Sequence, residues 1–317
     1  MIEGKTIAVI IPVYNVGEII IKVINKVPNF VDHIFVVDDA CPLMTGGIVI
    51  RSNLKDQRVK VFFNNKNLGV GGSTKVGFHE SLRLNIDIII KIDGDDQMDS
   101  DDVIHFVNTL KNNIFDYAKG NRFLKKNSIE NYPLARFYGN IILSFLTKLS
   151  SGYWDIFDPI NGFIAIKSTT LKKIDLQNLD NKYFFETDLL FNLNLLNFKV
   201  KDIPVNIKYN DNQIQNLSVL KEIPNFFCKN IIRFFKRVNQ KYLTNNFTIT
   251  SLFSFFFIIN LIAVIFYSVP NFIYYSFLKK TFAPTGIIMF SGIFLTLCVL
   301  SFLIFCILDS NDNPNNK

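Results

Sequence analysis

The chain has 317 residues with a formal net charge of +7, and 49% of its residues are hydrophobic, including 33 Phe. This length suits one large domain with an appendage or two modest domains, and so much Phe is rare in a soluble protein. The four cysteines show no CxxC spacing and no partner histidines, which argues against a zinc site and a disulfide framework.

The first half of the chain alternates strand-like and helix-like segments. β-branched apolar runs predict five strands, at 5–13, 31–37, 59–63, 87–92 and 115–119. Helical periodicity predicts helices among them, at 18–26, 69–84 and 99–112. This alternation is typical of an α/β domain with a mostly parallel sheet. Such sheets bind ligands beyond the carboxyl ends of their strands.

The middle of the chain, 121–211, is less regular, with helices expected at 132–151 and 186–196 and a loop at 152–162. From 222 to 242, Ile, Phe and Val recur at helical spacing with Lys and Arg between them. That pattern predicts a basic amphipathic helix on an anionic membrane surface.

Two uncharged apolar stretches follow, at 252–269 and 285–308. Each has 18 residues or more, enough for a helix to cross a hydrocarbon core of about 30 Å. Buried core helices are the alternative, although core helices normally keep one polar face. The expected organisation is a catalytic domain at 1–215, an amphipathic region at 216–246, two transmembrane helices at 247–309 and a disordered tail at 310–317.

The distribution of positive charge predicts the topology. Lys and Arg between 229 and 241 favour the cytoplasmic side, and two crossings return the C-terminus there. Lys279 and Lys280, between the crossings, argue mildly against this orientation. No signal peptide is visible, so we expect a multi-pass membrane protein whose catalytic domain is cytosolic.

The strongest local motif is an acidic loop after the fourth predicted strand. Asp93, Asp95, Asp96 and Gln97 follow one another closely, and Gly94 permits a tight backbone. Clustered hard oxygen ligands suit Mg²⁺ or Mn²⁺, with a diphosphate supplying the remaining ligands. A solvated acidic turn is the bland alternative.

Three other motifs lie at strand ends or before a helix. They are Pro12-Val13-Tyr14-Asn15, the adjacent carboxylates Asp38 and Asp39, and the glycine-rich segment 65–78. The carboxylates could hydrogen-bond a base or a ribose hydroxyl, and the glycines could admit a phosphate to backbone N–H groups. An Asx-capped turn and a purely structural glycine turn are the respective alternatives.

Taken together, these motifs resemble a known family. VIIPVYN, VVDDACP, NLGVGG and KIDGDDQ, in this order and spacing, resemble family 2 glycosyltransferases of the GT-A fold. The resemblance continues through KGNRF at 119–123, Gly139-Asn140, DPINGF at 158–163, FFETDLL at 184–190, NLSVLKEIP at 216–224 and FAPTGIIMF at 282–290. This set resembles polyprenyl-phosphate glycosyltransferases, relatives of dolichol-phosphate mannose synthase with two C-terminal membrane helices. The resemblance implies a GT-A domain, a juxtamembrane amphipathic helix and two transmembrane helices.

The resemblance also implies residue roles. Asp93, Asp95 and Gln97 would surround the metal, Mg²⁺ or Mn²⁺, and the diphosphate. Arg122 and Arg136 would hold the acceptor phosphate. The nucleotide-binding set would be Pro12, Tyr14, Asn15, Glu18, Asp38, Asp39, Gly69 and Asp93. Asp158 and Asn161 would lie in the loop that closes over the sugar. Asn121 and Ile164 depart from the family pattern, which often has Ser and Arg there.

The expected chemistry needs little general-base help. A phosphate monoester is largely ionised near neutral pH, since its second pKa is about 6. Guanidinium groups match phosphate bidentately, so arginines would orient the nucleophile. Asp158, Glu186 and Asp188 are candidates for a residual base or a sugar-positioning carboxylate. The alternative for Glu186 is a structural role, as a negative charge that stabilises the N-terminus of a helix. The predicted catalytic set is Asp95, Asp158, Glu186, Arg122 and Arg136.

The predicted function is inverting transfer of a single sugar from a UDP- or GDP-linked donor to a polyprenyl phosphate at the cytosolic membrane face, in cell envelope polysaccharide or glycan biosynthesis. A processive polysaccharide synthase would usually show a QxxRW motif and more membrane helices. A non-catalytic nucleotide-binding membrane scaffold or a lipid-carrier translocase component is the other alternative. Nucleic-acid binding is disfavoured because the basic cluster adjoins the apolar stretches. The sugar, the nucleotide base, the polyprenyl chain and homo-oligomerisation stay open.

Overall fold

The computed structural model describes residues 2–52, 54–125, 134–206, 219–245 and 247–316, with side chains at all of these except 134–136, 219–223 and 245. The chain forms two compact units, Met1–Ile231 and Ile232–Lys317. The division falls within helix α8 (Val219–Val238), and the predicted domain boundary between 215 and 216 lies outside the described residues.

The first unit contains a seven-stranded sheet in the order β3-β2-β1-β4-β6-β5-β7. The strands are β1 (Ile7–Val13), β2 (His33–Asp38), β3 (Val59–Phe63), β4 (Ile88–Lys91), β5 (Tyr117–Asn121), β6 (Ile164–Lys167) and β7 (Val200–Pro204). Among the strands of the described ranges, only β6 runs antiparallel to its neighbours, β4 and β5. The predicted mostly parallel α/β sheet is therefore confirmed, while β6 and β7 were not predicted.

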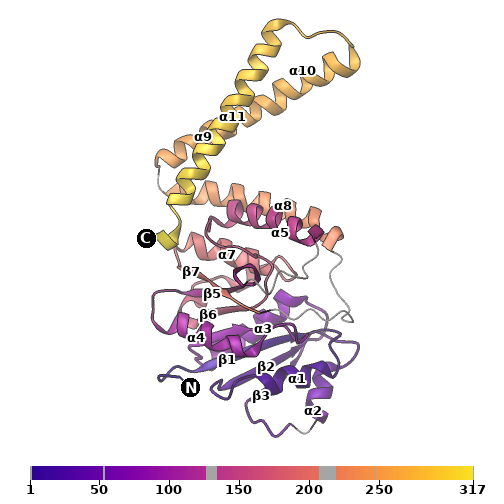
Figure 1. Ribbon diagram of the computed structural model, residues 1–317, viewed down its shortest axis with the longest axis vertical. Coiled ribbons are helices and arrows are strands. Elements are labelled where there is room, and N and C mark those ends of the chain that lie inside the picture. Colours follow the sequence, from indigo (N-terminus) through magenta and orange to yellow (C-terminus); the bar gives the residue numbers. More distant parts are fainter. Residues whose placement is uncertain (1, 53, 126–133, 207–218, 246, 317) are drawn as a thin grey trace. The chain divides into compact units, whose positions relative to one another are not determined.

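Helices cover both faces of this sheet (Figure 1). They are α1 (Ile19–Lys26), α2 (Thr45–Arg51), α3 (Val70–Arg83), α4 (Val103–Lys111), α6 (Ser168–Leu171) and α7 (Phe185–Leu195). Among the described residues, helix α5 (Leu134–Ser151) packs against α7 and not against the sheet. The short helices α2 and α6 had no counterpart in the prediction.

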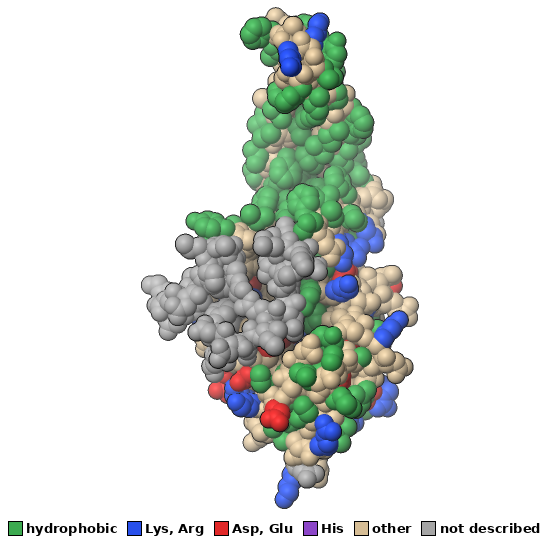
Figure 2. All heavy atoms as spheres, turned by 90° about the vertical axis from the view of Figure 1, so that its right-hand side faces the viewer, with side chains coloured by type: hydrophobic (Ala, Val, Ile, Leu, Met, Phe, Trp, Pro, Cys, Tyr) green, Lys and Arg blue, Asp and Glu red, His purple; other side chains and the backbone are tan. Residues whose placement is uncertain are grey.

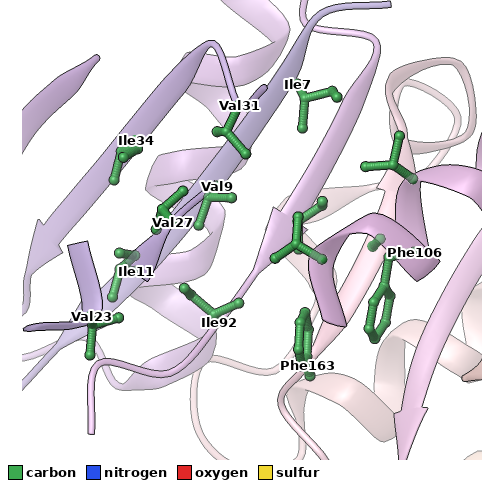
Figure 3. Close-up of a cluster of buried hydrophobic side chains, with 14 of the residues drawn as sticks. Ile7, Val9, Ile11, Val23, Val27, Val31, Ile34, Ile92, Phe106 and Phe163 are labelled. Atoms are coloured by element: carbon green, nitrogen blue, oxygen red, sulfur yellow. The ribbon is translucent and has the colours of Figure 1, made fainter. Parts of the chain in front are cut away.

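Strand β1 is buried on both of its faces, so its side chains contribute to two core clusters, one on each side of the sheet. Successive strand side chains point to opposite faces, so Ile7, Val9 and Ile11 pack beside Val23 of α1 and Phe106 of α4 (Figure 3). Ala8 and Ile10 face the other way and belong to a second cluster with residues of α3 and α7. Each fully buried Ile contributes roughly 2 kcal/mol of apolar burial.

The reversed strand β6 decides where the loop before it lies. Lys91 at the end of β4 pairs in register with Ile164 at the start of β6. Because the two strands run in opposite directions, residues 158–163 lie at the edge where β1, β2, β4 and β5 also end. The polar segments named above therefore meet at one edge of the sheet.

The second unit contains the two predicted membrane helices. α9 (Ile249–Ala263) continues through π-helical turns and α10 (Val269–Ile273) to Leu278, and α11 (Thr285–Asn311) follows. Both segments, Ile249–Leu278 and Thr285–Asn311, are long and apolar enough to cross a membrane. Phe257 and Phe302 pack between them, with ring centroids 5.0 Å apart. Figure 2 shows their outer surface as largely hydrophobic, with Lys or Arg side chains at the tip.

The end of α11 differs from the disordered tail predicted at 310–317. The helix continues to Asn311 and the chain is ordered through residue 316, with a turn at Pro314–Asn316. Lys241 Nζ donates to the Asp312 backbone oxygen at 3.0 Å and forms an ion pair with Asp312 Oδ2 at 3.1 Å. These contacts hold the tail against residue 241, which its polar sequence did not predict.

A buried ion pair lies beside these contacts. Arg237 Nη1 and Nη2 donate to the two carboxylate oxygens of Asp309 at 2.6 and 2.8 Å, and Tyr242 Oη donates to Asp309 Oδ1 at 2.6 Å. Both Arg237 and Asp309 are fully buried. The bidentate geometry offsets the desolvation of the two charges.

We expect Asp309→Asn to destabilise the second unit by about 3–5 kcal/mol, because the guanidinium of Arg237 would stay buried without its counter-charge. Thermal unfolding of the full chain in detergent micelles measures this. Asp101→Asn, at an exposed position, is the matched control and should change stability by less than about 0.5 kcal/mol. Equal melting temperatures for the two variants would contradict the expectation.

Candidate active site

The acidic loop after β4 holds two carboxylates close together. Burial, followed by repulsion from Asp93, raises the pKa of Asp95 to about 6. Asp96 behaves differently, because it lies in the left-handed region at φ +60° and forms an ion pair with Lys26 of α1. The Gln97 backbone N–H donates to Asp95 Oδ1 at 3.1 Å. Asp93 and Asp95 therefore repel each other, whereas the charge of Asp96 is compensated by Lys26.

The acidic loop fits a divalent cation bound jointly with a ligand. A cation would relieve the repulsion between Asp93 and Asp95. Within the described ranges, no group of three or more His, Cys, Asp or Glu residues is arranged to hold a metal. Mg²⁺ and similar ions usually take one or two carboxylates and complete their shell with phosphate oxygens and water. The ligand set Asp93, Asp95 and Gln97 stays a prediction.

A buried lysine that the sequence analysis missed lies directly beneath this loop. Lys91 Nζ donates to Asp93 Oδ1 at 2.8 Å, to Glu186 Oε1 at 3.0 Å and to the Gly162 backbone oxygen at 3.3 Å. Burial alone would lower the pKa of Lys91, but Asp93 and Glu186 outweigh it and raise the pKa above its ordinary value. The charged residue inside the apolar run IIIKI was the available signal.

Glu186, predicted as a candidate base, lies at the start of α7 and is 4% exposed. Its carboxylate is paired with Lys91. Asp188, another candidate, is fully buried and accepts a hydrogen bond from the Asp180 backbone N–H at 2.9 Å. The structure thus gives both carboxylates partners inside the first unit.

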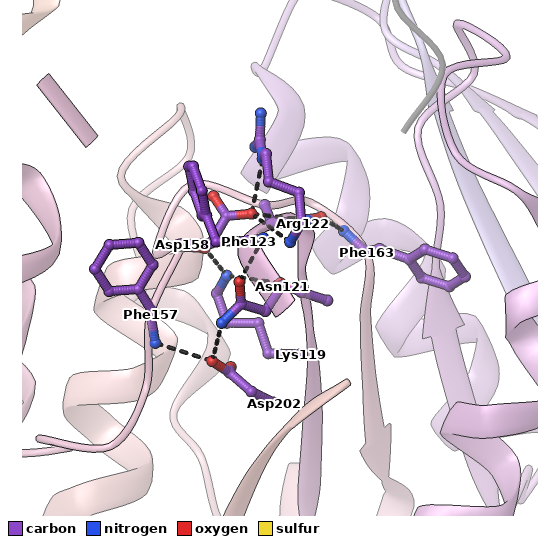
Figure 4. Close-up of polar contacts among 10 residues, drawn as sticks. Lys119, Asn121, Arg122, Phe123, Phe157, Asp158, Phe163 and Asp202 are labelled. Carbon is purple, nitrogen blue, oxygen red and sulfur yellow. Dashed lines mark hydrogen bonds and ion pairs between the residues drawn. The ribbon is translucent and has the colours of Figure 1, made fainter. Parts of the chain in front are cut away.

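Arg122 and Asp158 form the second charged group at this edge (Figure 4). Arg122 Nε and its backbone N–H donate to Asp158 Oδ2 at 2.7 and 3.2 Å, and Asn161 Nδ2 donates to the same oxygen at 3.1 Å. Burial would raise the pKa of Asp158, but Arg122 and Lys119 outweigh it and hold the pKa below its ordinary value. A carboxylate with a depressed pKa is a weak base. The side chain of Arg136, in α5, lies outside the described residues.

A further buried set anchors the loop that carries Asp158. Asp202 Oδ2 accepts from Asn121 Nδ2 at 2.6 Å and from the Phe157 backbone N–H at 2.9 Å (Figure 4). Lys119 is fully buried, and its Nζ donates to the Asp158 backbone oxygen. Burial raises the pKa of Asp202 to about 6. Asp202 was not predicted because it lies outside the motifs, and Lys119, although it begins the motif KGNRF, was given no role.

The paired carboxylates after β2 organise the neighbouring loops. Asp38 accepts from the backbone N–H groups of Cys41 and Gly46, both at 2.7 Å. Asp39 accepts from Asn64 Nδ2 and from the backbone N–H groups of Leu68 and Gly69, all at 2.8 Å. Contacts of Asp38 and Asp39 with a nucleoside stay a prediction; the observed bonds shape the edge around them.

The glycine-rich segment owes its composition to close packing. A Cβ at Gly71 would lie 2.6 Å from the Asp180 backbone oxygen, and one at Gly77 would lie 2.5 Å from a side-chain carbon of Ile10. Gly69 has φ +88° and precedes α3. Its N–H is already bonded to Asp39. These contacts favour the structural alternative for the glycines, while a role for Gly69 in nucleotide binding stays a prediction.

The remaining nucleotide-binding candidates lie on or just after β1. Pro12 is buried within the strand, whereas Tyr14, Asn15 and Glu18 are exposed in the loop that follows. Asn15 lies in the left-handed region at φ 57°. Three exposed side chains therefore lie at the edge of the sheet where Asp93 and Asp95 are found.

An exposed apolar face on α5 is a further feature that the sequence analysis missed. Tyr138, Ile142 and Phe145 are 62%, 61% and 47% exposed. The ring of Trp154 lies edge-on to Phe145, with centroids 6.4 Å apart. Within the first unit α5 packs against the middle of α8, where Ser150 Oγ donates to Asn230 Oδ1 at 2.6 Å.

Comparison with known proteins identifies the family. Residues 8–175 match the model described as Glycosyl transferase family 2. The chain belongs to glycosyl transferase family 2. It is therefore a glycosyltransferase, and the predicted GT-A fold is confirmed.

Two curated relatives of this family 2 glycosyltransferase cover similar parts of the chain. The UDP-N-acetylglucosamine–dolichyl-phosphate N-acetylglucosaminyltransferase of Methanococcus voltae is 28% identical over 65% of this chain and 87% of its own. The undecaprenyl-phosphate mannosyltransferase of Micrococcus luteus is 25% identical over 62% of this chain and 81% of its own.

Among solved structures, glucosyl-3-phosphoglycerate synthase from Mycobacterium tuberculosis, in complex with Mn²⁺, UDP and phosphoglyceric acid, has a similar fold. The TM-score is 0.54 at 17% identity, over 74% of this chain and 78% of that one. At this identity the likeness concerns the fold.

We expect the stability of Asp202→Asn, measured relative to the wild type, to increase by about 1 kcal/mol when the pH is raised from 5 to 7.5. The folded-state pKa of about 6 lies above the ordinary value of 3.8. Folding is therefore favoured while Asp202 is protonated, and that stability is lost as the pH rises through 6. An Asn oxygen can accept both hydrogen bonds that now reach Oδ2. Melting temperatures of the two proteins at both pH values measure the effect, and a pH-independent difference would contradict it.

Proposed function

We propose that this family 2 glycosyltransferase transfers one sugar from a nucleotide-sugar donor to the phosphate of a polyprenyl lipid, with inversion, at the cytosolic face of a membrane. The observation that carries the proposal is a family 2 domain in the same chain as two helices of membrane-spanning length. The named activities of the Methanococcus and Micrococcus relatives support this class of acceptor.

The donor side is the acidic loop and the residues after β1 and β2. Asp93, Asp95 and Gln97 would hold Mg²⁺ or Mn²⁺, which acts as a Lewis acid on the departing diphosphate. Tyr14, Asn15 and Glu18 are exposed at the same edge, where they would contact a UDP- or GDP-linked sugar. Asp38 and Asp39 accept hydrogen bonds from the backbone of the loops next to this edge and so fix the positions of those loops.

On the acceptor side, Arg122 is held against the loop that carries Asp158. Arg122, oriented by Asp158, would bind the lipid phosphate, and Arg136 is proposed for the same role. The phosphate oxygen is its own nucleophile, since a phosphate monoester is already ionised at neutral pH. The low pKa of Asp158 suits an orienting role better than that of a base. Its Oδ1 is buried with no hydrogen-bond partner among the described residues, and a sugar hydroxyl would satisfy it.

The apolar and basic surfaces suit work at a membrane. A polyprenyl chain does not leave the bilayer readily, because each exposed CH₂ costs about 0.8 kcal/mol. The spanning helices would keep the enzyme in the membrane that holds its acceptor. The exposed apolar face of α5 and the basic amphipathic helix α8 would contact the lipid headgroup layer.

The deciding experiment incubates the purified full chain with polyprenyl phosphate, Mg²⁺ or Mn²⁺, and a panel of UDP- and GDP-linked sugars. We expect a lipid-linked sugar with one donor, and a loss of at least a hundredfold in Asp95→Ala. Asp101→Asn, whose side chain is exposed, is the control variant. Absence of product with every donor, although UDP or GDP binds, would contradict the proposal.

Arg122→Lys tests the acceptor side. Lysine keeps the charge but loses the planar fork that binds phosphate and the Nε contact to Asp158. We expect the KM for polyprenyl phosphate to rise about tenfold with the donor KM unchanged. Steady-state kinetics with each substrate varied in turn measures both. Lys125→Gln, a nearby cation paired with Asp102, should leave both KM values unaltered. A rise confined to the donor KM would argue against acceptor binding by Arg122.

A further inference from the structure

Lys91 contacts both the acidic loop of the proposed donor side and the loop that carries Asp158. It is the last residue of β4 and is 1% exposed. Its ammonium group donates to the Asp93 carboxylate in the acidic loop and to the Gly162 backbone oxygen in the loop before β6. The third partner, Glu186, comes from α7. One buried cation thus joins three separate elements.

The position is tightly packed as well as charged. A Cβ at Gly162 would lie 2.5 Å from both Lys91 Nζ and Asp93 Oδ2. The loop backbone is therefore pressed directly against the ion pair, without space for a methyl group. A small displacement of either loop would break these contacts, because packed interiors do not deform continuously.

The contacts continue from Gly162 to the arginine of the acceptor side. The preceding residue, Asn161, donates to Asp158, and Asp158 accepts from Arg122 at 2.7 Å. Asp93 and Arg122 are thereby linked through Lys91 and the loop residues Gly162, Asn161 and Asp158.

We propose that Lys91 is a positioning residue that fixes the acidic donor-side loop relative to the acceptor-side loop carrying Asp158. Glu186 serves as the counter-ion that makes a buried lysine tolerable. This inference rests on the proposed transfer reaction and assigns a further residue to it. The consequence for rate is large, because a misplacement of about 1 Å between reacting groups can lower the rate about a hundredfold.

The first test is Lys91→Met, which keeps an unbranched apolar side chain and removes the ammonium group. We expect kcat to fall ten- to a hundredfold while the KM values for donor and acceptor change less than threefold. A purely structural role would lower the yield of folded enzyme and leave the kcat of the folded fraction unaltered. Lys167→Met is the matched control, because Lys167 ends β6 and pairs with Ile88 at the opposite edge of the sheet.

Lys91→Met leaves two carboxylates without their cation and is therefore at risk of misfolding. The double variant Lys91→Met/Glu186→Gln removes one of those charges, so its fold should be as stable as that of Glu186→Gln. We expect its kcat to be at least tenfold lower than that of Glu186→Gln alone. Equal kcat values for the double variant and Glu186→Gln would overturn the proposal.

A readout independent of turnover comes from Trp154, the single tryptophan of the chain. It lies four residues before Asp158, in the acceptor-side segment. We expect Mg²⁺ with UDP or GDP to change the Trp154 emission of the wild type and to leave that of Lys91→Met unchanged, although equilibrium dialysis shows nucleotide bound to both. An identical change in both proteins would overturn the inference. Absence of lipid-linked product from the wild type would instead count against the proposed reaction.

Discussion

The antiparallel pairing of β6 between β4 and β5 is the constraint on which the site depends. Had β6 run parallel to its neighbours, residues 158–163 would lie at the amino ends of the strands, far from the acidic loop. The register of Lys91 with Ile164 instead places the loop before β6 directly beside the residues that follow β4. Asp93, Asp95 and the Arg122–Asp158 pair therefore share one edge of the sheet.

Buried charge holds this edge together. Lys91, Lys119 and Asp158 are almost wholly removed from water, and each has an opposite charge or a backbone partner. Breaking one member of a buried pair costs about 3–5 kcal/mol, so these loops have one strongly preferred arrangement. Asp95 is the contrasting case, because repulsion from Asp93 adds to burial in raising its pKa. The buried ion pairs thus fix the loops around Lys91 and Asp158, whereas the two carboxylates of the acidic loop repel each other.

The proposed reaction explains why these two units occur in one chain. A lipid phosphate supplies its own nucleophile, so the protein must orient it and stabilise the departing diphosphate. Both tasks need fixed charges more than a base, and fixed charges are what the edge of the sheet provides. The helices Ile249–Leu278 and Thr285–Asn311 would keep that site in the membrane where the acceptor is confined.

The sequence by itself determined the features that depend on local pattern. Five strands, the acidic loop and the two apolar spans follow from side-chain periodicity and composition, and their positions agree with the structure to within a few residues at most ends. Tertiary structure alone decided the reversal of β6, the partners of Lys91 and the order of the tail. These depend on contacts between distant residues, such as Lys91 with Glu186 and Arg237 with Asp309. A local pattern shows that a charge is present, but only the fold shows which opposite charge it meets.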